Sequence, residues 1–321
     1  MSNSQFAYKP GRYAAIDIGT VTARLLIADV DEQGEIAEVH RDHAICNLGV
    51  GVDKTGRLAP EAIERVGAVV GRFVKAIDEL QLENGGPTVV TANATSASRD
   101  AEHSGDFVAV LAELGVELSV IPGEKEAALS FAGASSAFGG ESVIVLDVGG
   151  GSSEIIAGQA GGTPAYAHSF NIGCRRVTER YFHDDPPTVE QIADAGAWIA
   201  SEMHDYLQTV SQNGFGGCRI VAVAGTATSV ISMRERMEVY DSSRVHGAVA
   251  TRGDLDELLA RLSGMTLEER QKVVGLDPQR APVIVAGVLI LQQILQQFGA
   301  DSFTVSERDI LHGIILDAAT E

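Results

Sequence analysis

The chain has 321 residues, 45% of them apolar and 21% charged, which suits two domains of ordinary size and excludes a disordered protein. With 24 Lys and Arg against 44 Asp and Glu, the net charge is −20, and such a surface repels nucleic acid and anionic membranes at long range. An anionic substrate must therefore be held by local groups, such as backbone amides, a few arginines or a divalent cation.

The cysteines and the apolar runs indicate the compartment. Cys46, Cys174 and Cys218 are too few and too scattered for a disulfide framework or a zinc site. The first twelve residues contain no apolar segment typical of a secretory signal. The longest uncharged run, Ala281–Phe298, is interrupted by pairs of glutamine and is too short to span a membrane. We therefore expect a cytoplasmic protein.

Up to residue 137 the sequence alternates predicted strands and helices. Two apolar runs, 13–18 and 24–30, are joined by a short turn and predict a β-hairpin. A helix is expected to begin at Pro60, because proline suits the first helical position and apolar residues then recur at steps of three and four. The further elements are a strand at 88–92, a helix at 106–114, a strand at 116–121 and a helix at 124–137.

The pattern restarts after Phe138-Gly139-Gly140. Strands are expected at 143–148 and 154–157, again around a glycine-rich turn. A third strand, 220–224, leads into a helix that opens with Gly225-Thr226-Ala227-Thr228. The remaining elements are a buried helix at 281–298, a strand at 303–305, and a last helix that Ser306 with Asp309 is expected to cap.

The starts of the two halves superpose. Asp17-Ile18-Gly19-Thr20 aligns with Asp147-Val148-Gly149-Gly150 at an offset of 147 − 17 = 130. The same offset places Arg24 on Glu154, so the two turns have equal length. We interpret this match as an internal duplication rather than as two unrelated strand–glycine turns.

Glycine-rich turns of this kind can bind phosphate, because glycine lets the backbone approach closely and the amides carry partial positive charge. Hydroxyl groups at Thr20, Thr22, Ser152 and Ser153 add hydrogen-bond donors. Carboxylates at the strand ends, Asp17 and Asp147, can hold Mg²⁺, usually through water. One such turn alone is more often an ordinary hairpin, but a duplicated pair with a third Gly-Thr turn at Gly225 and Thr226 favours the functional interpretation.

Two further residues are candidates for the chemistry. Glu126, at the junction of the two halves, can orient and deprotonate a water molecule, or it can merely be a solvated glutamate in the first turn of a helix. On physical grounds alone the second alternative is better. Arg99, in a stretch of small polar residues, can clamp a phosphate or can pair with Asp100.

These residues together resemble the exopolyphosphatase/guanosine pentaphosphate phosphohydrolase (Ppx/GppA) family, short two-domain type. The motifs are individually weak, but in this order and spacing they are specific and run along most of the chain. They are Asp17-Ile18-Gly19-Thr20 with Arg24-Leu25-Leu26, Thr95-Ser96-Ala97-Ser98-Arg99-Asp100-Ala101, Gly123-Glu124-Lys125-Glu126-Ala127, Leu146-Asp147-Val148-Gly149-Gly150-Gly151-Ser152-Ser153-Glu154, Ala224-Gly225-Thr226-Ala227-Thr228-Ser229, Arg280-Ala281-Pro282-Val283-Ile284-Val285-Ala286-Gly287 and Val305-Ser306-Glu307-Arg308-Asp309-Ile310-Leu311-His312-Gly313.

The resemblance implies an α/β protein of two actin-like (ribonuclease H-like, ASKHA) domains with an interdomain cleft. We expect domain I at 1–135, with the first phosphate loop and Glu126, and domain II at 136–321, with the second loop. The implied activity is that of a cytoplasmic, Mg²⁺-dependent hydrolase that removes the terminal phosphate from polyphosphate or guanosine pentaphosphate. A requirement for a monovalent cation such as K⁺, and a homodimer, are left open.

By position, Glu126 matches the family's general base, and Asp147 and Glu154 match the acidic residues around metal and water. Arg99 matches an arginine that contacts phosphate. The expected site is completed by Asp17 as a metal ligand and by phosphate contacts at Gly19, Thr20, Thr22, Gly149, Gly150, Gly151, Ser152, Ser153, Gly225 and Thr226.

The first loop departs from the family pattern Gly-(Ser/Thr)-Asn-Ser, because Val21 stands where the family usually has asparagine. Lys125 likewise replaces a frequent acidic neighbour of the catalytic glutamate. Two alternatives follow. A sensor that binds these phosphates without turnover is favoured by Val21, and an ATP-dependent kinase is the rival enzyme of the same fold.

Overall fold

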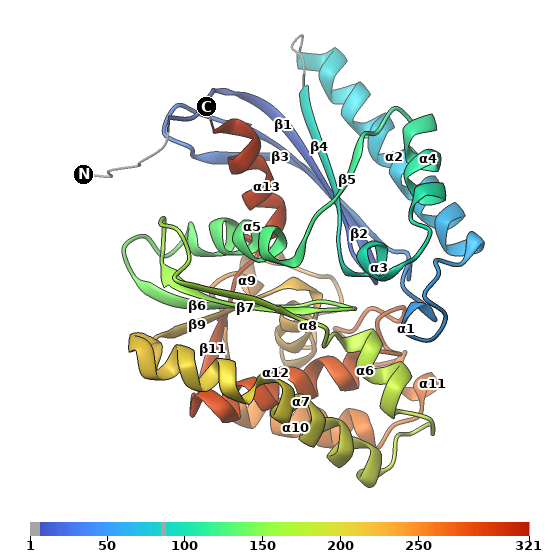
Figure 1. Cartoon of the computed structure of the whole chain (residues 1–321), viewed down its shortest axis with the longest axis vertical. Helices are drawn as coiled ribbons and strands as arrows, with labels where there is room; N and C mark the ends of the chain where they lie inside the picture. The colour runs from blue at the N-terminus through green and yellow to red at the C-terminus, as the bar shows by residue number, and fades with distance from the viewer. Residues whose placement is uncertain (1–6, 85–87, 321) are drawn as a thin grey trace. The chain divides into compact units, whose positions relative to one another are not determined.

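The computed structural model describes residues 7–84 and 88–320. The chain divides into two compact units, which we call unit 1 (Met1–Ser136 with Arg308–Glu321) and unit 2 (Ala137–Glu307). Each unit contains one mixed β-sheet and helices, so the predicted α/β class is confirmed (Figure 1). Within the described ranges, no helix is both long and apolar enough to cross a membrane.

The sheet of unit 1 has the strand order β3-β2-β1-β4-β5. Its strands are β1 (Gly11–Ile18), β2 (Thr22–Val30), β3 (Ile36–Ile45), β4 (Thr88–Ala94) and β5 (Leu118–Val120). Strand β2 is antiparallel to β1 and β3, whereas β4 is parallel to β1 and β5. A three-stranded meander extended by parallel strands in this order is the sheet of a ribonuclease H-like domain, as the sequence predicted.

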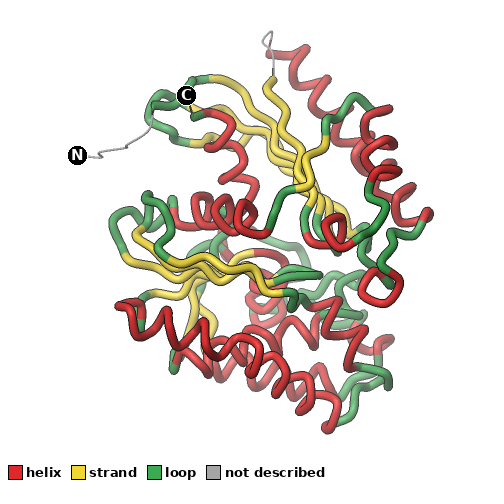
Figure 2. Tube along the Cα trace, viewed as in Figure 1, coloured by secondary structure: helices red, strands yellow, loops and turns green. Residues whose placement is uncertain are grey.

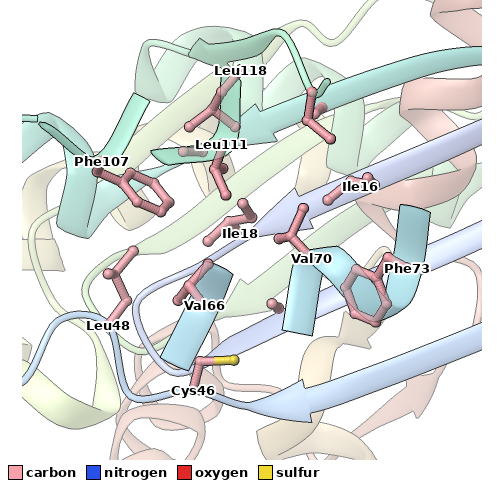
Figure 3. Close-up of a cluster of buried hydrophobic side chains, with 14 of the residues drawn as sticks. Ile16, Ile18, Cys46, Leu48, Val66, Val70, Phe73, Phe107, Leu111 and Leu118 are labelled. Carbon is pink, nitrogen blue, oxygen red and sulfur yellow. The ribbon is translucent and has the colours of Figure 1, made fainter. Parts of the chain in front are cut away.

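Helices cover both faces of this sheet. They are α1 (Val52–Thr55), α2 (Pro60–Asn84), α3 (Ser96–Asp100), α4 (Gly105–Glu113), α5 (Gly123–Ser135) and α13 (Ile310–Ala319). Successive residues of a strand point to opposite faces, so Ile16 and Ile18 of β1 pack into one core with Phe73 of α2 (Figure 3). Tyr13 and Ala15 pack into a second core with α5 and α13. The central strand is therefore buried on both sides.

Unit 2 has the strand order β10-β11-β9-β6-β7-β8. The strands of both units are the yellow segments of Figure 2, and the helices are red. Its elements are β6 (Ser142–Val148), β7 (Ser153–Gln159), β8 (Tyr166–Phe170), α6 (Cys174–Tyr181), α7 (Val189–Val210), the π-helical turn η1 (Ser211–Phe215), β9 (Arg219–Val223), α8 (Ala224–Arg234), α9 (Ser242–Val245), β10 (Val249–Thr251), α10 (Arg252–Ser263), α11 (Leu267–Arg270), α12 (Ile284–Phe298) and β11 (Ser302–Val305). Helix α12 is buried along most of its length and packs against α7 and α10, which explains why its sequence is apolar on nearly every side.

The duplication read from the sequence is confirmed in the sheets. Strands β6, β7, β8, β9 and β11 repeat the order and directions of β1, β2, β3, β4 and β5. The register is also repeated, because Asp17 lies opposite Arg24 and Asp147 lies opposite Glu154. Both turns are closed by the same bond, from the Gly19 and Gly149 amides to the carbonyls three residues later, at 3.0 Å in each case.

The last helix belongs to unit 1, whereas the expected single boundary at 135/136 assigns it to domain II. Helix α13 follows β11 of unit 2 in the chain, yet its apolar residues Ile310, Leu311 and Ile314 complete the second core of unit 1. Asp309 caps this helix, since its carboxylate accepts a hydrogen bond from the Leu311 amide at 3.0 Å, whereas Ser306 lies before the cap. The chain therefore returns to unit 1 at residue 308.

Helices α5 and α13 approach closely through a reciprocal pair of glycines. A Cβ atom added to Gly133 would overlap the carbonyl oxygen of Asp309, and one added to Gly313 would overlap that of Leu129. Gly133 thus faces Asp309, four positions before Gly313, and Gly313 faces Leu129, four positions before Gly133. Only a residue without a side chain allows this backbone-to-backbone contact.

We predict that Gly313→Ala destabilises unit 1 by about 1–3 kcal/mol, because the added methyl group must push the two helix backbones apart. A thermal melt followed by circular dichroism measures this as a fall in Tm. Gly105→Ala is the matched control: Gly105 is also helical, its added Cβ has no neighbour within 4 Å, and its Tm is expected to stay level or rise slightly. Equal Tm values for both variants would contradict the close helix contact.

Candidate functional site

The β1–β2 turn of unit 1 is held from one side by the segment that follows β3, residues 46–49, which we call the first holding segment. Its backbone amides donate to the turn as follows: Cys46 N and Asn47 N to Val21 O, both at 2.8 Å, and Gly49 N to Thr20 O at 2.9 Å. Because the C=O and N–H of a trans peptide point in opposite directions, the amides of Val21 and Thr22 face away from this segment. The hydroxyl oxygen of Thr20 is buried and has no hydrogen-bond partner among the described residues.

The β6–β7 turn of unit 2, residues 149–152, is held in the same way by residues 171–176, the second holding segment. Its bonds are Cys174 N to Gly149 O at 2.9 Å, Arg175 N to Gly150 O at 2.8 Å, and the Arg176 Nε to Gly151 O at 2.9 Å. With three successive carbonyls directed at α6, the amides of Gly150, Gly151 and Ser152 face the opposite side. In the described part of the chain these three amides have no hydrogen-bond partner. A row of such amides is the backbone geometry that binds phosphate oxygens.

The holding segments are functional candidates that our sequence analysis missed. They contain a second repeat, Asn47-Leu48-Gly49 and Asn171-Ile172-Gly173, at an offset of 171 − 47 = 124. Comparison of the two halves beyond the first turn would have found it. In each segment the glycine lies against the turn, because a Cβ on Gly49 would overlap Thr20 and a Cβ on Gly173 would overlap the peptide between Gly150 and Gly151.

Carboxylates at the two strand ends have different neighbours. Asp17 is 2% exposed, and its Oδ2 is 2.6 Å from Nη2 of Arg24, whose Nη1 is 2.6 Å from Oδ2 of Asp309. Burial raises the pKa of Asp17, and the Arg24 charge opposes that rise. The arginine in contact with Oδ2 repels a divalent cation and so argues against Asp17 as a Mg²⁺ ligand, whereas Oδ1 is buried and has no hydrogen-bond partner among the described residues.

At the equivalent position unit 2 pairs two acidic residues. Asp147 and Glu154 lie directly across the strands and are buried, and the Ser169 hydroxyl donates to Glu154 Oε1 at 2.7 Å. Carboxylate oxygens are the ligands Mg²⁺ prefers. Among the residues described, no group of three or more His, Cys, Asp and Glu side chains is placed to hold a metal. A pair of carboxylates is nevertheless sufficient for Mg²⁺, which usually completes its shell with water and substrate phosphate.

The β9–α8 turn supports the second loop rather than duplicating it. The Thr226 hydroxyl donates to the Val148 carbonyl at 3.3 Å and is thus engaged inside unit 2. Gly225 lies under the guanidinium of Arg280, which a Cβ at this position would overlap. Ala224 adopts a left-handed φ of 64°, a conformation that an L-residue takes only at some cost. The turn therefore positions Arg280, a cation that the sequence motif contained but that we had not assigned to the site.

The predicted base and the predicted phosphate-binding arginine form an ion pair in unit 1. Glu126 lies in the first turn of α5 and is 8% exposed, and its Oε2 is 2.6 Å from Nη1 of Arg99. Arg99 therefore does not pair with Asp100, whose carboxylate instead lies 3.4 Å from the Ser96 hydroxyl. Glu126 is a buried, paired carboxylate and not the solvated glutamate of the simpler alternative.

Val21, the departure from the family pattern in the first loop, is 4% exposed. Its side chain is buried and does not face solvent. An apolar side chain suits a buried position of this kind.

We predict that Gly173→Ala weakens binding of imidodiphosphate, a non-hydrolysable phosphate pair, by at least about tenfold. The added methyl group displaces the turn, and each charge-assisted hydrogen bond lost from it is worth roughly 1.5–3 kcal/mol. Titration calorimetry well below the Tm measures the affinity. Gly139→Ala is the control, since its Cβ would have no neighbour within 4 Å. Unchanged affinity in Gly173→Ala would show that the turn amides do not hold the anion.

Comparison with known proteins gives one consistent result. The model of the Ppx/GppA phosphatase family matches residues 26–321. Exopolyphosphatase 2 of Mycobacterium tuberculosis is 38% identical over 323 residues, which cover 96% of this chain and 98% of that protein.

Solved structures extend the likeness to the fold. The crystal structure of an exopolyphosphatase-like protein has a TM-score of 0.88 and 33% identity, and the match covers 97% of this chain and 98% of that one. The PPX-GPPA enzyme of Aquifex aeolicus has a TM-score of 0.78 and 30% identity, with 96% and 99% of the chains covered.

Proposed function

The chain belongs to the Ppx/GppA phosphatase family, and we propose that it hydrolyses the terminal phosphoanhydride bond of inorganic polyphosphate or of guanosine pentaphosphate. The observation that carries this proposal is the row of outward amides at Gly150, Gly151 and Ser152. These donors are fixed before any ligand arrives, so they can stabilise phosphoryl charge without reorganising. The exopolyphosphatase names of the relatives support the same substrate class.

The reaction needs a base for the attacking water, and we assign that role to Glu126. The water oxygen forms a bond to the terminal phosphorus, and the carboxylate of Glu126 takes the proton. The bridging P–O bond breaks, and its electron pair stays with the shortened phosphate chain. Most of the acceleration in phosphoryl transfer comes from positioning and charge stabilisation, with the base adding about 10²–10⁴-fold.

We assign Asp147 and Glu154, rather than Asp17, to a divalent cation. Bound Mg²⁺ would supply positive charge next to the phosphate oxygens. The two carboxylates are rigidly placed, because β6 and β7 fix their backbones and Ser169 orients Glu154. The free thiols at Cys46, Cys174 and Cys218 agree with a reducing compartment, and we propose the cytoplasm as the location.

The alternative of a sensor without turnover was favoured only by Val21 in the first loop. Val21 is buried, and burial by itself favours an apolar side chain at this position.

We predict phosphate release from long polyphosphate, tripolyphosphate or guanosine pentaphosphate in the presence of Mg²⁺, and ATP is assayed beside them. Glu126→Gln, which keeps the shape of the side chain but cannot take the proton, should lower kcat by on the order of 10²-fold or more when it is assayed well below its Tm. A colorimetric phosphate assay across the four substrates tests both statements. No release from any of them under Mg²⁺ would overturn the proposed hydrolysis, and near-normal kcat in the variant would remove Glu126 from it.

We predict that Asp147→Asn weakens Mn²⁺ binding, followed by the electron paramagnetic resonance of the free ion, by at least about tenfold. Asp17→Asn is the matched control, because it changes the equivalent carboxylate of unit 1, which forms an ion pair with Arg24. Its Mn²⁺ affinity is expected to equal that of the unmodified protein. Equal loss in both variants would contradict the assignment of the cation to unit 2.

A further inference from the structure

We propose that Arg99 is a positioning residue, which holds the Glu126 carboxylate with one nitrogen and leaves its other donors to a phosphate group of the substrate. This inference rests on the proposed function and deepens it. From the sequence, Arg99 was a phosphate clamp or a partner of Asp100. The structure suggests a third role, in which Arg99 contacts both the Glu126 carboxylate and the phosphate group that the activated water attacks.

The geometry of the guanidinium carries the argument. Nη1 of Arg99 donates to Glu126 Oε2 at 2.6 Å and to the Ile121 carbonyl at 3.0 Å. Among the described residues, Nε and Nη2 of Arg99 have no hydrogen-bond partner. The arginine side chain is 19% exposed and that of Glu126 is 10% exposed. Arg99 therefore retains donors on a partly accessible edge while one nitrogen is occupied.

Rigid elements place both side chains. Arg99 lies in the last turn of α3, directly after β4, and Glu126 lies in the first turn of α5, shortly after β5. Strands β4 and β5 are parallel neighbours, and the Ile121 amide donates to the Ala94 carbonyl at 3.0 Å just beyond their paired region. Adjacent parallel strands end at the same edge of a sheet. The two side chains meet at that edge.

The chemistry requires arginine. A guanidinium is planar and has five donors in a fixed fork, so it can bind a carboxylate and a phosphate at the same time with a set distance between them. A lysine offers one compact charge on a flexible chain and cannot fix both partners. A carboxylate also has several acceptor positions, so the bond to Nη1 leaves Glu126 able to accept a proton.

The experiment is a double-mutant cycle with Arg99→Lys, Glu126→Gln and the double variant, in which kcat and KM for tripolyphosphate are measured. If Arg99 acts through the base, Arg99→Lys should lower kcat by about 10–100-fold in the unmodified protein. In the Glu126→Gln background the same change should lower kcat by less than about threefold, because no base is left to position.

Equal factors in both backgrounds, or an effect on KM alone, would overturn the inference and leave Arg99 as a simple phosphate clamp. An equal fall in Tm for all variants with no coupling in kcat would also overturn it, by indicating a structural ion pair. Arg72→Lys serves as control, since Arg72 forms a solvent-exposed ion pair with Asp42 in the same unit and should leave kcat unchanged. Near-normal kcat in Glu126→Gln would instead remove the base, and with it the proposed mechanism, so the two failures are distinguishable.

Discussion

Backbone hydrogen bonds to the carbonyls of the two β-turns are the constraint on which the other features depend. A glycine-rich turn without such bonds could rotate its peptides freely, and its amides would point in many directions. Here, residues 46–49 bind the carbonyls of one turn and residues 171–176 those of the other. The direction of the amides then follows from the planarity of the peptide bond. The side on which each turn presents its amides is thus opposite the side on which its carbonyls are bonded.

The duplicated hairpins share this construction and differ in charge. Position 24 is arginine and its repeat, position 154, is glutamate, although both face an aspartate across the same strand pair. In unit 1 Arg24 forms ion pairs with both Asp17 and Asp309, so it ties the turn to the cap of α13. In unit 2 two carboxylates stand together, an arrangement that is costly when buried unless a cation or donors compensate it. The different residue at this one position of the repeat therefore underlies our assignment of the cation to unit 2.

Much of the local structure could be predicted from the sequence, because it depends on near neighbours. Helix α2 begins at Pro60 as expected, and both hairpins lie where the glycine turns indicated. Strand β3 was missed, since it is largely accessible and lacks the alternation of a half-buried strand. The roles of Asp17 and Arg99 could not be derived, because each depends on a partner brought near by strand pairing or by sheet topology. Asp17 meets Arg24 across a hairpin, and Arg99 meets Glu126 only because β4 and β5 end side by side.

The return of the chain to unit 1 has a consequence for synthesis on the ribosome. Unit 2 is an insertion whose residues are contiguous, so all of its strands and helices exist before α13 is made. Unit 1 lacks one wall of its second core until Ile310–Ala319 has emerged, and Tyr13, Ala15 and Leu26 stay partly uncovered until then. The inserted unit is therefore able to fold first, while the unit that begins the chain is completed after it. Contacts between β1 and α13 also join residues about three hundred positions apart, a separation that slows folding.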